Sequence, residues 1–182
     1  MLYIIRHGKT DWNVVYKLQG RTDIPLNEEG RLMAENAAKE CADIDIDICY
    51  SSPLIRAKET AKILLRGRDI PIEYDDRLME MGFGEYEGSE RCLDIPDCNV
   101  KVLFKNPELY RADRGAESME DLLGRTKAFL EEIVYPKLDA GMNVLIVGHG
   151  AMNCALTCHI RGYDLSHFWD GMTDNCKLVR LK

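Results

Sequence analysis

The stretch MLYIIRHGKTDWN (residues 1–13) places an arginine, a histidine and a glycine directly after a short apolar run. The run Leu2–Arg6 is apolar and rich in isoleucine, which predicts a short buried strand. A second apolar run, NVLIVGHG (143–150), ends in a histidine between two glycines. In parallel α/β sheets, ligands bind beyond the carboxyl ends of the strands, so these two endings predict a shared ligand site.

Helices and strands alternate along the rest of the chain. We expect helices from Asn27 to about Cys41, over 53–65, from Ser118 to about Leu138 and over 151–160, and strands over 44–52, 70–74 and 176–181. This alternation is typical of βαβ units and of a mostly parallel sheet. No repeat or linker divides the chain, so we expect one domain over 1–182, with an insertion at about 85–115 that covers the substrate site.

Composition limits the class of protein and its partners. The chain has 182 residues, of which 46% are apolar and 30% charged, which is typical of one folded domain. A net charge of -7 disfavours a nucleic-acid partner or an anionic membrane surface. No secretory leader and no apolar run of membrane-spanning length is present, which predicts a cytoplasmic protein. The oligomeric state stays open.

Seven cysteines without a CxxC pair favour reduced thiols over a disulfide framework. Cys154 and Cys158 lie one helical turn apart beside His159, a spacing that is compatible with metal binding. Free cysteine is also a small buried hydrophobe, and no second pair of ligands is spaced to complete a metal site. We therefore favour packing for these cysteines and expect no metal and no other cofactor.

Three separate segments bring arginine and histidine to the predicted edge of the sheet. Arg6 and His7 end the first strand, Arg56 lies in the first turn of the helix after the second strand, and His149 follows the run NVLIV. Arginine matches phosphate oxygens with paired hydrogen bonds, and a neutral imidazole can attack phosphorus and carry the group covalently. These residues therefore predict a phosphate site that contains a histidine nucleophile.

Six segments in order carry a family resemblance: RHGKTDWN (6–13), LQGRTDIPLNEEG (18–30), YSSPLIRAKETA (50–61), RLMEMGFGEYEG (77–88), GAESMEDL (115–122) and VLIVGHGAM (144–152). The chain resembles the histidine phosphatase superfamily, in its phosphoglycerate mutase-like branch, and within it the small phosphatases. The resemblance implies a three-layer α/β/α sandwich whose sheet is parallel except for one antiparallel strand.

The resemblance also implies roles for single residues. His7 would be the nucleophile that forms a phosphohistidine, and Glu80 would donate a proton to the leaving oxygen. The phosphate ligands would be Arg6, Arg56, His149 and Asn13, and Gln19 and Gly20 would line the pocket. Glu87 is an alternative acid in the same stretch, for which we favour a structural role.

The implied activity is hydrolysis of a small phosphorylated metabolite. Two alternatives remain, a phosphoglycerate mutase and a non-catalytic protein that binds phosphorylated ligands on the same fold. Mutases are typically longer between the acid and the second histidine and carry a tail after the last strand, so hydrolysis is favoured. Among the cations of the insertion, four either bind a second anionic group of the substrate or are solvated surface charges: Lys101, Lys105, Arg111 and Arg114.

Overall fold

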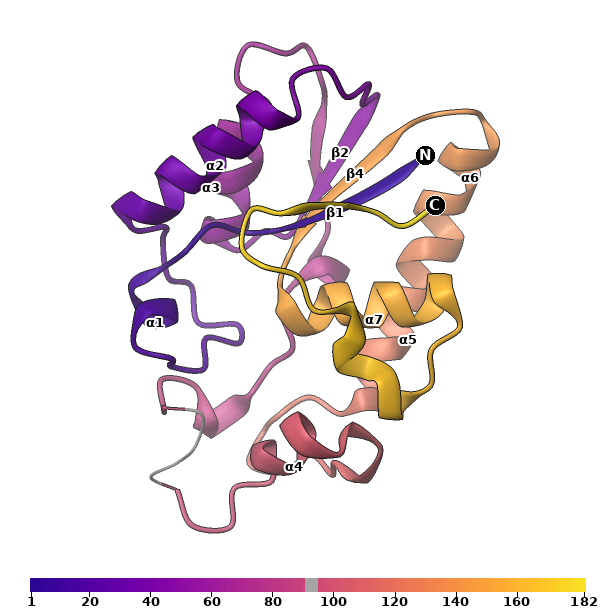
Figure 1. Cartoon of the computed structure of the whole chain (residues 1–182). Helices are drawn as coiled ribbons and strands as arrows, with labels where there is room; N and C mark the ends of the chain where they lie inside the picture. The colour runs from indigo at the N-terminus through magenta and orange to yellow at the C-terminus, as the bar shows by residue number, and fades with distance from the viewer. Residues whose placement is uncertain (91–94) are drawn as a thin grey trace.

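The computed structural model describes residues 1–90 and 95–182, which form layers of helices around a five-stranded sheet (Figure 1). The strands are β1 (Leu2–Arg6), β2 (Ile48–Ser51), β3 (Ile72–Tyr74), β4 (Val144–Gly148) and β5 (Leu178–Arg180), in the order β3-β2-β4-β1-β5. Neighbouring strands pair in parallel except β1 and β5, which are antiparallel. The predicted mixed sheet is thereby confirmed.

Helices cover both faces of this sheet (Figure 1). The helices of the described ranges are α1 (Asp11–Val14), α2 (Glu28–Glu40), α3 (Ile55–Leu64), α4 (Val100–Lys105), α5 (Met119–Phe129), α6 (Tyr135–Asp139) and α7 (Gly150–Arg161). Short 3₁₀ turns occur at η1 (Asp76–Leu78), η2 (Gly84–Tyr86), η3 (Pro107–Leu109) and η5 (Leu165–Gly171). Helices α2 and α3 pack together on one face, and α5 and α7 pack together on the other.

The side chains of each buried strand point alternately to the two faces of the sheet, so the apolar core lies on both faces. In β1, Tyr3 and Ile5 pack with alanines of α2 and α3, whereas Leu2 and Ile4 pack with Phe129 and other residues of the α5 and α7 side. Successive side chains of a strand point to opposite faces, so a strand that is apolar throughout needs cover on both sides. The predicted three-layer sandwich follows and is confirmed.

Two predicted helix starts are confirmed by their capping bonds. The side chain of Asn27 accepts the N–H of Gly30 at 2.8 Å, and that of Ser118 accepts the N–H of Asp121 at 3.0 Å. The long helix predicted from Ser118 is not uniform, because a π-helical turn at Leu130–Val134 joins α5 to α6. Helix α1 and the 3₁₀ turns, which carry no clear periodicity, were not predicted.

The strands predicted over 44–52 and 70–74 are shorter than expected, since β2 begins at Ile48 and β3 at Ile72. The alternating residues before β2 do not pair with a strand, because their aspartates accept hydrogen bonds from Asn143 in the loop before β4. The carboxylate of Asp47 accepts the N–H of Asn143 at 2.6 Å, and that of Asp45 accepts its side-chain amide at 3.2 Å.

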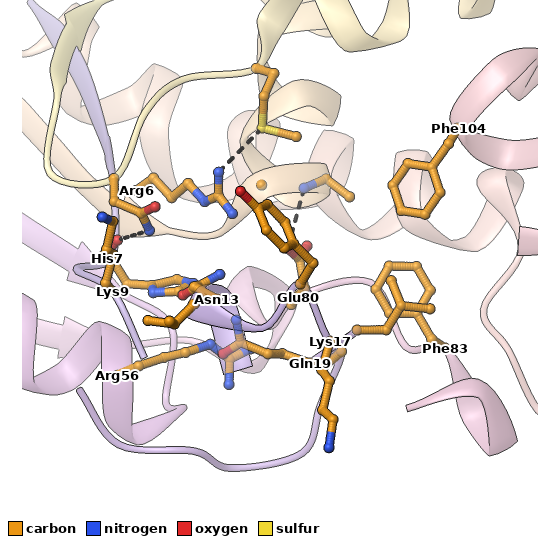
Figure 2. A pocket seen from close by; sticks show the side chains of 18 of the residues that line it. Arg6, His7, Lys9, Asn13, Lys17, Gln19, Arg56, Glu80, Phe83 and Phe104 are labelled. Atoms are coloured by element: carbon orange, nitrogen blue, oxygen red, sulfur yellow. Dashed lines mark hydrogen bonds between the residues drawn. The ribbon is translucent and has the colours of Figure 1, made fainter. Parts of the chain in front are cut away.

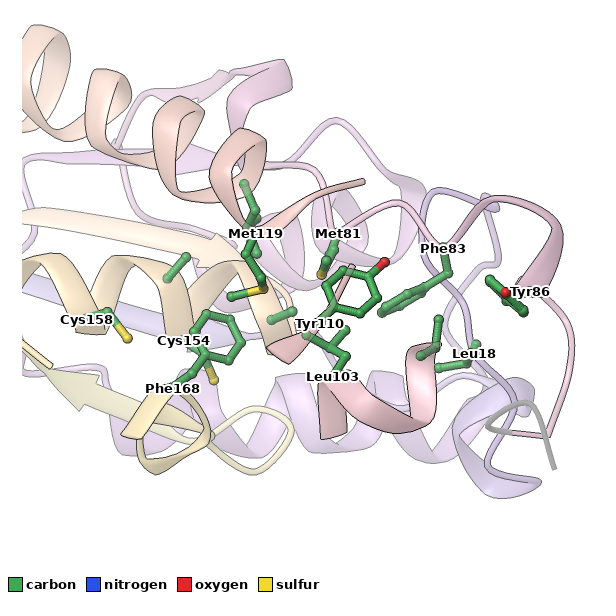
Figure 3. Packing of buried hydrophobic residues seen from close by; sticks show 14 of the residues in the cluster. Leu18, Met81, Phe83, Tyr86, Leu103, Tyr110, Met119, Cys154, Cys158 and Phe168 are labelled. Carbon is green, nitrogen blue, oxygen red and sulfur yellow. The ribbon is translucent and has the colours of Figure 1, made fainter. Parts of the chain in front are cut away.

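The insertion packs on the α5 and α7 side through a cluster of buried apolar residues (Figure 3). Leu103 of α4 lies in this cluster with Phe168 of η5 and with Cys154 and Cys158 of α7. The cysteines therefore pack in the core, and no group of three potential metal ligands occurs among residues 1–90 and 95–182. Nor is any helix in the described ranges long and apolar enough to cross a membrane.

Candidate active site

A cavity of about 870 Å³ lies beyond the carboxyl ends of β1 and β4. Most of the predicted site residues line it, from five separate segments: Arg6, His7, Asn13, Gln19, Gly20, Arg56 and Glu80. His149 is completely buried, and its ring centre lies 5.1 Å from that of His7. Figure 2 shows Arg6, His7 and Arg56 at one end of the cavity and Phe83 and Phe104 at the other.

His7 is held in one orientation by its own loop. Its Nδ1 lies 2.6 Å from the carbonyl oxygen of Gly8, so Nδ1 carries the proton and Nε2 keeps its lone pair. The loop is itself fixed, because Thr60 Oγ1 accepts the N–H of Gly8 at 3.0 Å and Asn175 donates to the carbonyl of His7 at 2.6 Å. Neither Thr60 nor Asn175 was predicted, because both come from distant segments.

The surroundings keep both imidazoles neutral. Burial, followed by the positive charges of Arg56 and Arg6, holds the pKa of His7 well below its usual value. Burial and Arg56 have the same effect on the pKa of His149. Both ring nitrogens of His149 are buried without a hydrogen-bond partner in the described part of the protein. His149 lies behind His7 and, unlike the other predicted site residues, does not line the cavity.

Arg56 is completely buried and is held by backbone carbonyls. Its Nη2 donates to Gly20 at 2.7 Å and its Nη1 to Thr22 at 2.9 Å. Burial lowers the pKa of Arg56 to about 10, so the guanidinium is still charged at neutral pH. The Nε atoms of Arg56 and Arg6 are both buried and have no protein partner within the described ranges. A buried guanidinium with a free N–H favours an anionic ligand.

Glu87 and Gly20 hold the loop that binds Arg56. The carboxylate of Glu87 accepts the N–H groups of Phe83, Arg21 and Thr22 at 3.0, 2.9 and 2.8 Å. Gly20 has a φ of +53°, and a Cβ there would lie 2.0 Å from Glu87 Oε1. Glu87 therefore has the structural role that we favoured, since its carboxylate joins the loop at Arg21 and Thr22 to the start of η2.

Thr10, a buried residue that the sequence did not single out, orients two amides of the cavity. Its hydroxyl donates to Gln19 Oε1 at 2.9 Å, and its N–H donates to Asn13 Oδ1 at 3.1 Å. Because both amide oxygens are bound by Thr10, both NH₂ groups remain for a ligand in the cavity. The only sequence signal for this role was a threonine at the N-cap of α1 with an asparagine three residues later.

Glu80 reaches the cavity from the segment after η1. Its Oε1 accepts the N–H groups of Met81 and Met152 at 2.9 and 3.0 Å, and its Oε2 accepts that of Ala151 at 3.3 Å. Two of these donors belong to the first turn of α7, so the helix start aims the carboxyl group. Arg125 supports the segment by donating to the carbonyl of Glu80 at 3.3 Å.

These groups together make a site for a tetrahedral anion beside a neutral imidazole. Guanidinium and amide N–H groups can bind its oxygens, Nε2 of His7 can attack its central atom, and a carboxyl group can exchange a proton with one of its oxygens.

The comparisons with known proteins agree with this chemistry. A family model described as the histidine phosphatase superfamily (branch 1) matches residues 2–182. The uncharacterized phosphatase PhoE of Bacillus subtilis is 37% identical, over 88% of this chain and 77% of the relative. Phosphoserine phosphatase 1 of Hydrogenobacter thermophilus is 31% identical, over 96% and 82%. The solved structure of Bacillus stearothermophilus YhfR is 35% identical, with a TM-score of 0.84 over 92% of this chain and 83% of the other.

Proposed function

This chain belongs to branch 1 of the histidine phosphatase superfamily, and from that premise we propose that it hydrolyses small phosphorylated metabolites through a phosphohistidine at His7. The phosphatase class is supported by relatives that are named phosphatases. The single observation that carries the mechanism is the 2.6 Å contact between His7 Nδ1 and Gly8 O, which leaves Nε2 as a nucleophile in a cavity with two arginines.

In the first step, the phosphate oxygens of the substrate bind Arg6, Arg56, His149 and the NH₂ groups of Asn13 and Gln19. The lone pair of His7 Nε2 attacks phosphorus, and the bond from phosphorus to the substrate oxygen breaks. Glu80, protonated in this step, gives its proton to that oxygen, and the alcohol leaves.

In the second step, water attacks the phosphorus of the phosphohistidine and passes a proton to the Glu80 carboxylate. The bond between phosphorus and nitrogen breaks, which releases inorganic phosphate and returns His7 to its neutral form. Preorganised N–H donors stabilise the charge on the transferred group in both steps.

The proposed mechanism requires that the phosphoryl group reside on His7 during turnover. Rapid quenching with a radiolabelled phosphomonoester should trap an alkali-stable, acid-labile phosphate on the protein. His7→Ala should lack both this phosphate and the release of inorganic phosphate, with Arg66→Ala, which is exposed on the surface after α3, as a control of normal activity. Full activity in His7→Ala would overturn the mechanism.

Hydrolysis and mutase activity are separated by one assay. With 3-phosphoglycerate and a catalytic amount of bisphosphoglycerate, the enzyme should release inorganic phosphate faster than it forms 2-phosphoglycerate. Isomerisation that exceeds phosphate release would favour the mutase.

We also propose that the protein works in the cytoplasm, with small phosphorylated substrates and without nucleic acid. The six cysteines in the described ranges are unpaired and buried, which supports the cytoplasm. The net charge of -7 supports the absence of a nucleic-acid partner.

The insertion at about 85–115 would cover the site, since Lys101, Phe104 and Lys105 of α4 line the cavity.

A further inference from the structure

The cavity extends well beyond the phosphate ligands. Its volume of about 870 Å³ lies in the range that encloses a whole small molecule, about 300–1,000 Å³. Its outer part is lined by aromatic side chains and by lysines: Phe83, Phe104, Trp169, Lys17, Lys101 and Lys105. The part far from His7 is therefore both apolar and cationic.

One side of α4 supplies three of these residues. Lys101, Phe104 and Lys105 are spaced by three and four positions, so they share a helix face, and all three line the cavity. Like charges four residues apart destabilise a helix. Among the described residues, neither ammonium group forms an ion pair, whereas Lys9 at the same cavity is paired with Glu29 at 2.5 Å.

Arg111 and Arg114, the other two cations that the sequence singled out, have partners outside the cavity. Arg111 donates to the carbonyl of Tyr110 at 2.8 Å, and the guanidinium of Arg114 lies 5.6 Å from the ring centre of Tyr86. Of the four cations that the sequence singled out, only Lys101 and Lys105 of α4 therefore line the substrate cavity.

Packing against the rest of the protein holds helix α4, and with it the backbone of these lysines, in place. Val100 and Leu103 are completely buried in the cluster that joins the insertion to α5 and α7 (Figure 3). Trp169 donates its indole N–H to the carbonyl of Leu103 at 2.8 Å, and its ring stacks on Phe104 with the ring centres 5.3 Å apart. Phe104 is still 38% exposed, so it offers an apolar surface to a ligand.

We propose that Lys101 and Lys105 bind a second anionic group of the substrate, across an apolar, preferably planar body that packs on Phe83 and Phe104. The substrate class is then a phosphomonoester whose alcohol carries a carboxylate or a second phosphate at the end away from the reacting phosphoryl group. This inference rests on the proposed phosphatase function and names its specificity.

Matched synthetic substrates test it. The first pair is 4-carboxybenzyl phosphate and 4-carbamoylbenzyl phosphate, which differ in charge but hardly in shape. The second pair is the corresponding biphenylmethyl phosphates, which place the same groups farther from phosphorus. In at least one pair, we expect the carboxylate to have a kcat/KM about 10-fold above that of the amide, as a charge-assisted contact predicts. Added salt should reduce this ratio.

The double variant Lys101→Met/Lys105→Met should bring the ratio of kcat/KM for the carboxylate to that for the amide close to one. The control Lys39→Met/Lys62→Met removes two exposed lysines of α2 and α3 and should keep the preference. A ratio near one in the unmodified enzyme, or no turnover of either pair while nitrophenyl phosphate is hydrolysed, would overturn the inference and leave the phosphatase function standing. If nitrophenyl phosphate is not hydrolysed either, the proposed function itself fails.

Discussion

The Nδ1 atom of His7 lies 2.6 Å from the carbonyl oxygen of Gly8, the next residue in the chain. A carbonyl only accepts, so this contact assigns the ring proton to Nδ1 and the lone pair to Nε2. We therefore expect the trapped phosphohistidine to be the Nε2 isomer. Phosphorus-31 or nitrogen-15 NMR of the quenched, denatured protein distinguishes the two isomers, and the Nδ1 isomer would contradict the assigned orientation of the ring.

The buried histidines predict how stability depends on pH. The pKa values of His7 and His149 are lowered well below the usual 6.5, chiefly by burial. Below pH 6.5 the unfolded chain then binds protons that the folded protein does not, so the free energy of unfolding falls as the pH falls. The expected slope is about 1.4 kcal/mol per pH unit for each histidine.

Denaturant unfolding between pH 7.5 and 5 measures this slope. In His7→Asn, this slope should be smaller by about 1.4 kcal/mol per pH unit, which corresponds to one proton. The carboxylates that also titrate are the same in the variant and in the unmodified protein, so they do not change the difference. His167 is an internal contrast, since its hydrogen bond to Asp164 raises its pKa and its contribution is lost as the pH rises. An identical slope in the variant would show that His7 is protonated in the folded state.

Glu80→Gln tests the proton donor. An alkoxide is a poor leaving group and needs a proton in the transition state, whereas a nitrophenolate does not. We expect kcat/KM to fall by about 10²- to 10⁴-fold for alkyl phosphates and much less for nitrophenyl phosphate. A loss of equal size for both substrates would argue against proton donation by Glu80.

Glu87→Gln is the matched control, because this carboxylate binds the N–H groups of Arg21, Thr22 and Phe83. The new amide NH₂ would face some of these donors, so we expect a loss of about 1–3 kcal/mol in the free energy of unfolding. The dependence of kcat/KM on the leaving group should not change. If it does, Glu87 and not Glu80 donates the proton.

Thr10→Val removes the hydroxyl that binds Gln19 Oε1 and caps the N–H of Asn13. The amide of Gln19 then loses the bond that orients it, whereas the N–H of Thr10 still binds Asn13 Oδ1. We expect kcat/KM to fall by about 10- to 100-fold, with weaker binding of inorganic phosphate measured by calorimetry. Thr10→Ser keeps the hydroxyl and should restore most of the activity. Equal losses in the two variants would mean that the methyl group of Thr10, and not its hydroxyl, matters.

The order of apolar runs along the chain was enough to predict a mostly parallel sheet with helices between its strands, whereas the three layers and the single antiparallel strand were implied by the family resemblance. The same reasoning overestimated the strand before Ile48, since the alternation of Ile44–Asp47 serves bonds to Asn143 and not a strand pair. Bonds of this kind join residues about 100 positions apart, and no local pattern encodes them.

Four of the candidate site residues were identifiable because they follow or flank predicted strand ends, which topology brings together: Arg6, His7, Arg56 and His149. Glu80 and the amides came from the motifs of the family and have no such local signal. Their orientation depends on Thr10 and on the first turn of α7, which only the folded chain brings near.

The sequence by itself determined the alternation of strands and helices, a mostly parallel sheet and the gathering of histidine and arginine at one edge, since periodicity and strand endings are local properties. Only the tertiary structure decided which nitrogen of His7 carries the lone pair, which of Glu80 and Glu87 enters the cavity, and which cations of the insertion face it. Each of these outcomes depends on the direction in which a side chain points. That direction is set by hydrogen bonds and packing between segments far apart in the chain, because local backbone preferences leave several rotamers open.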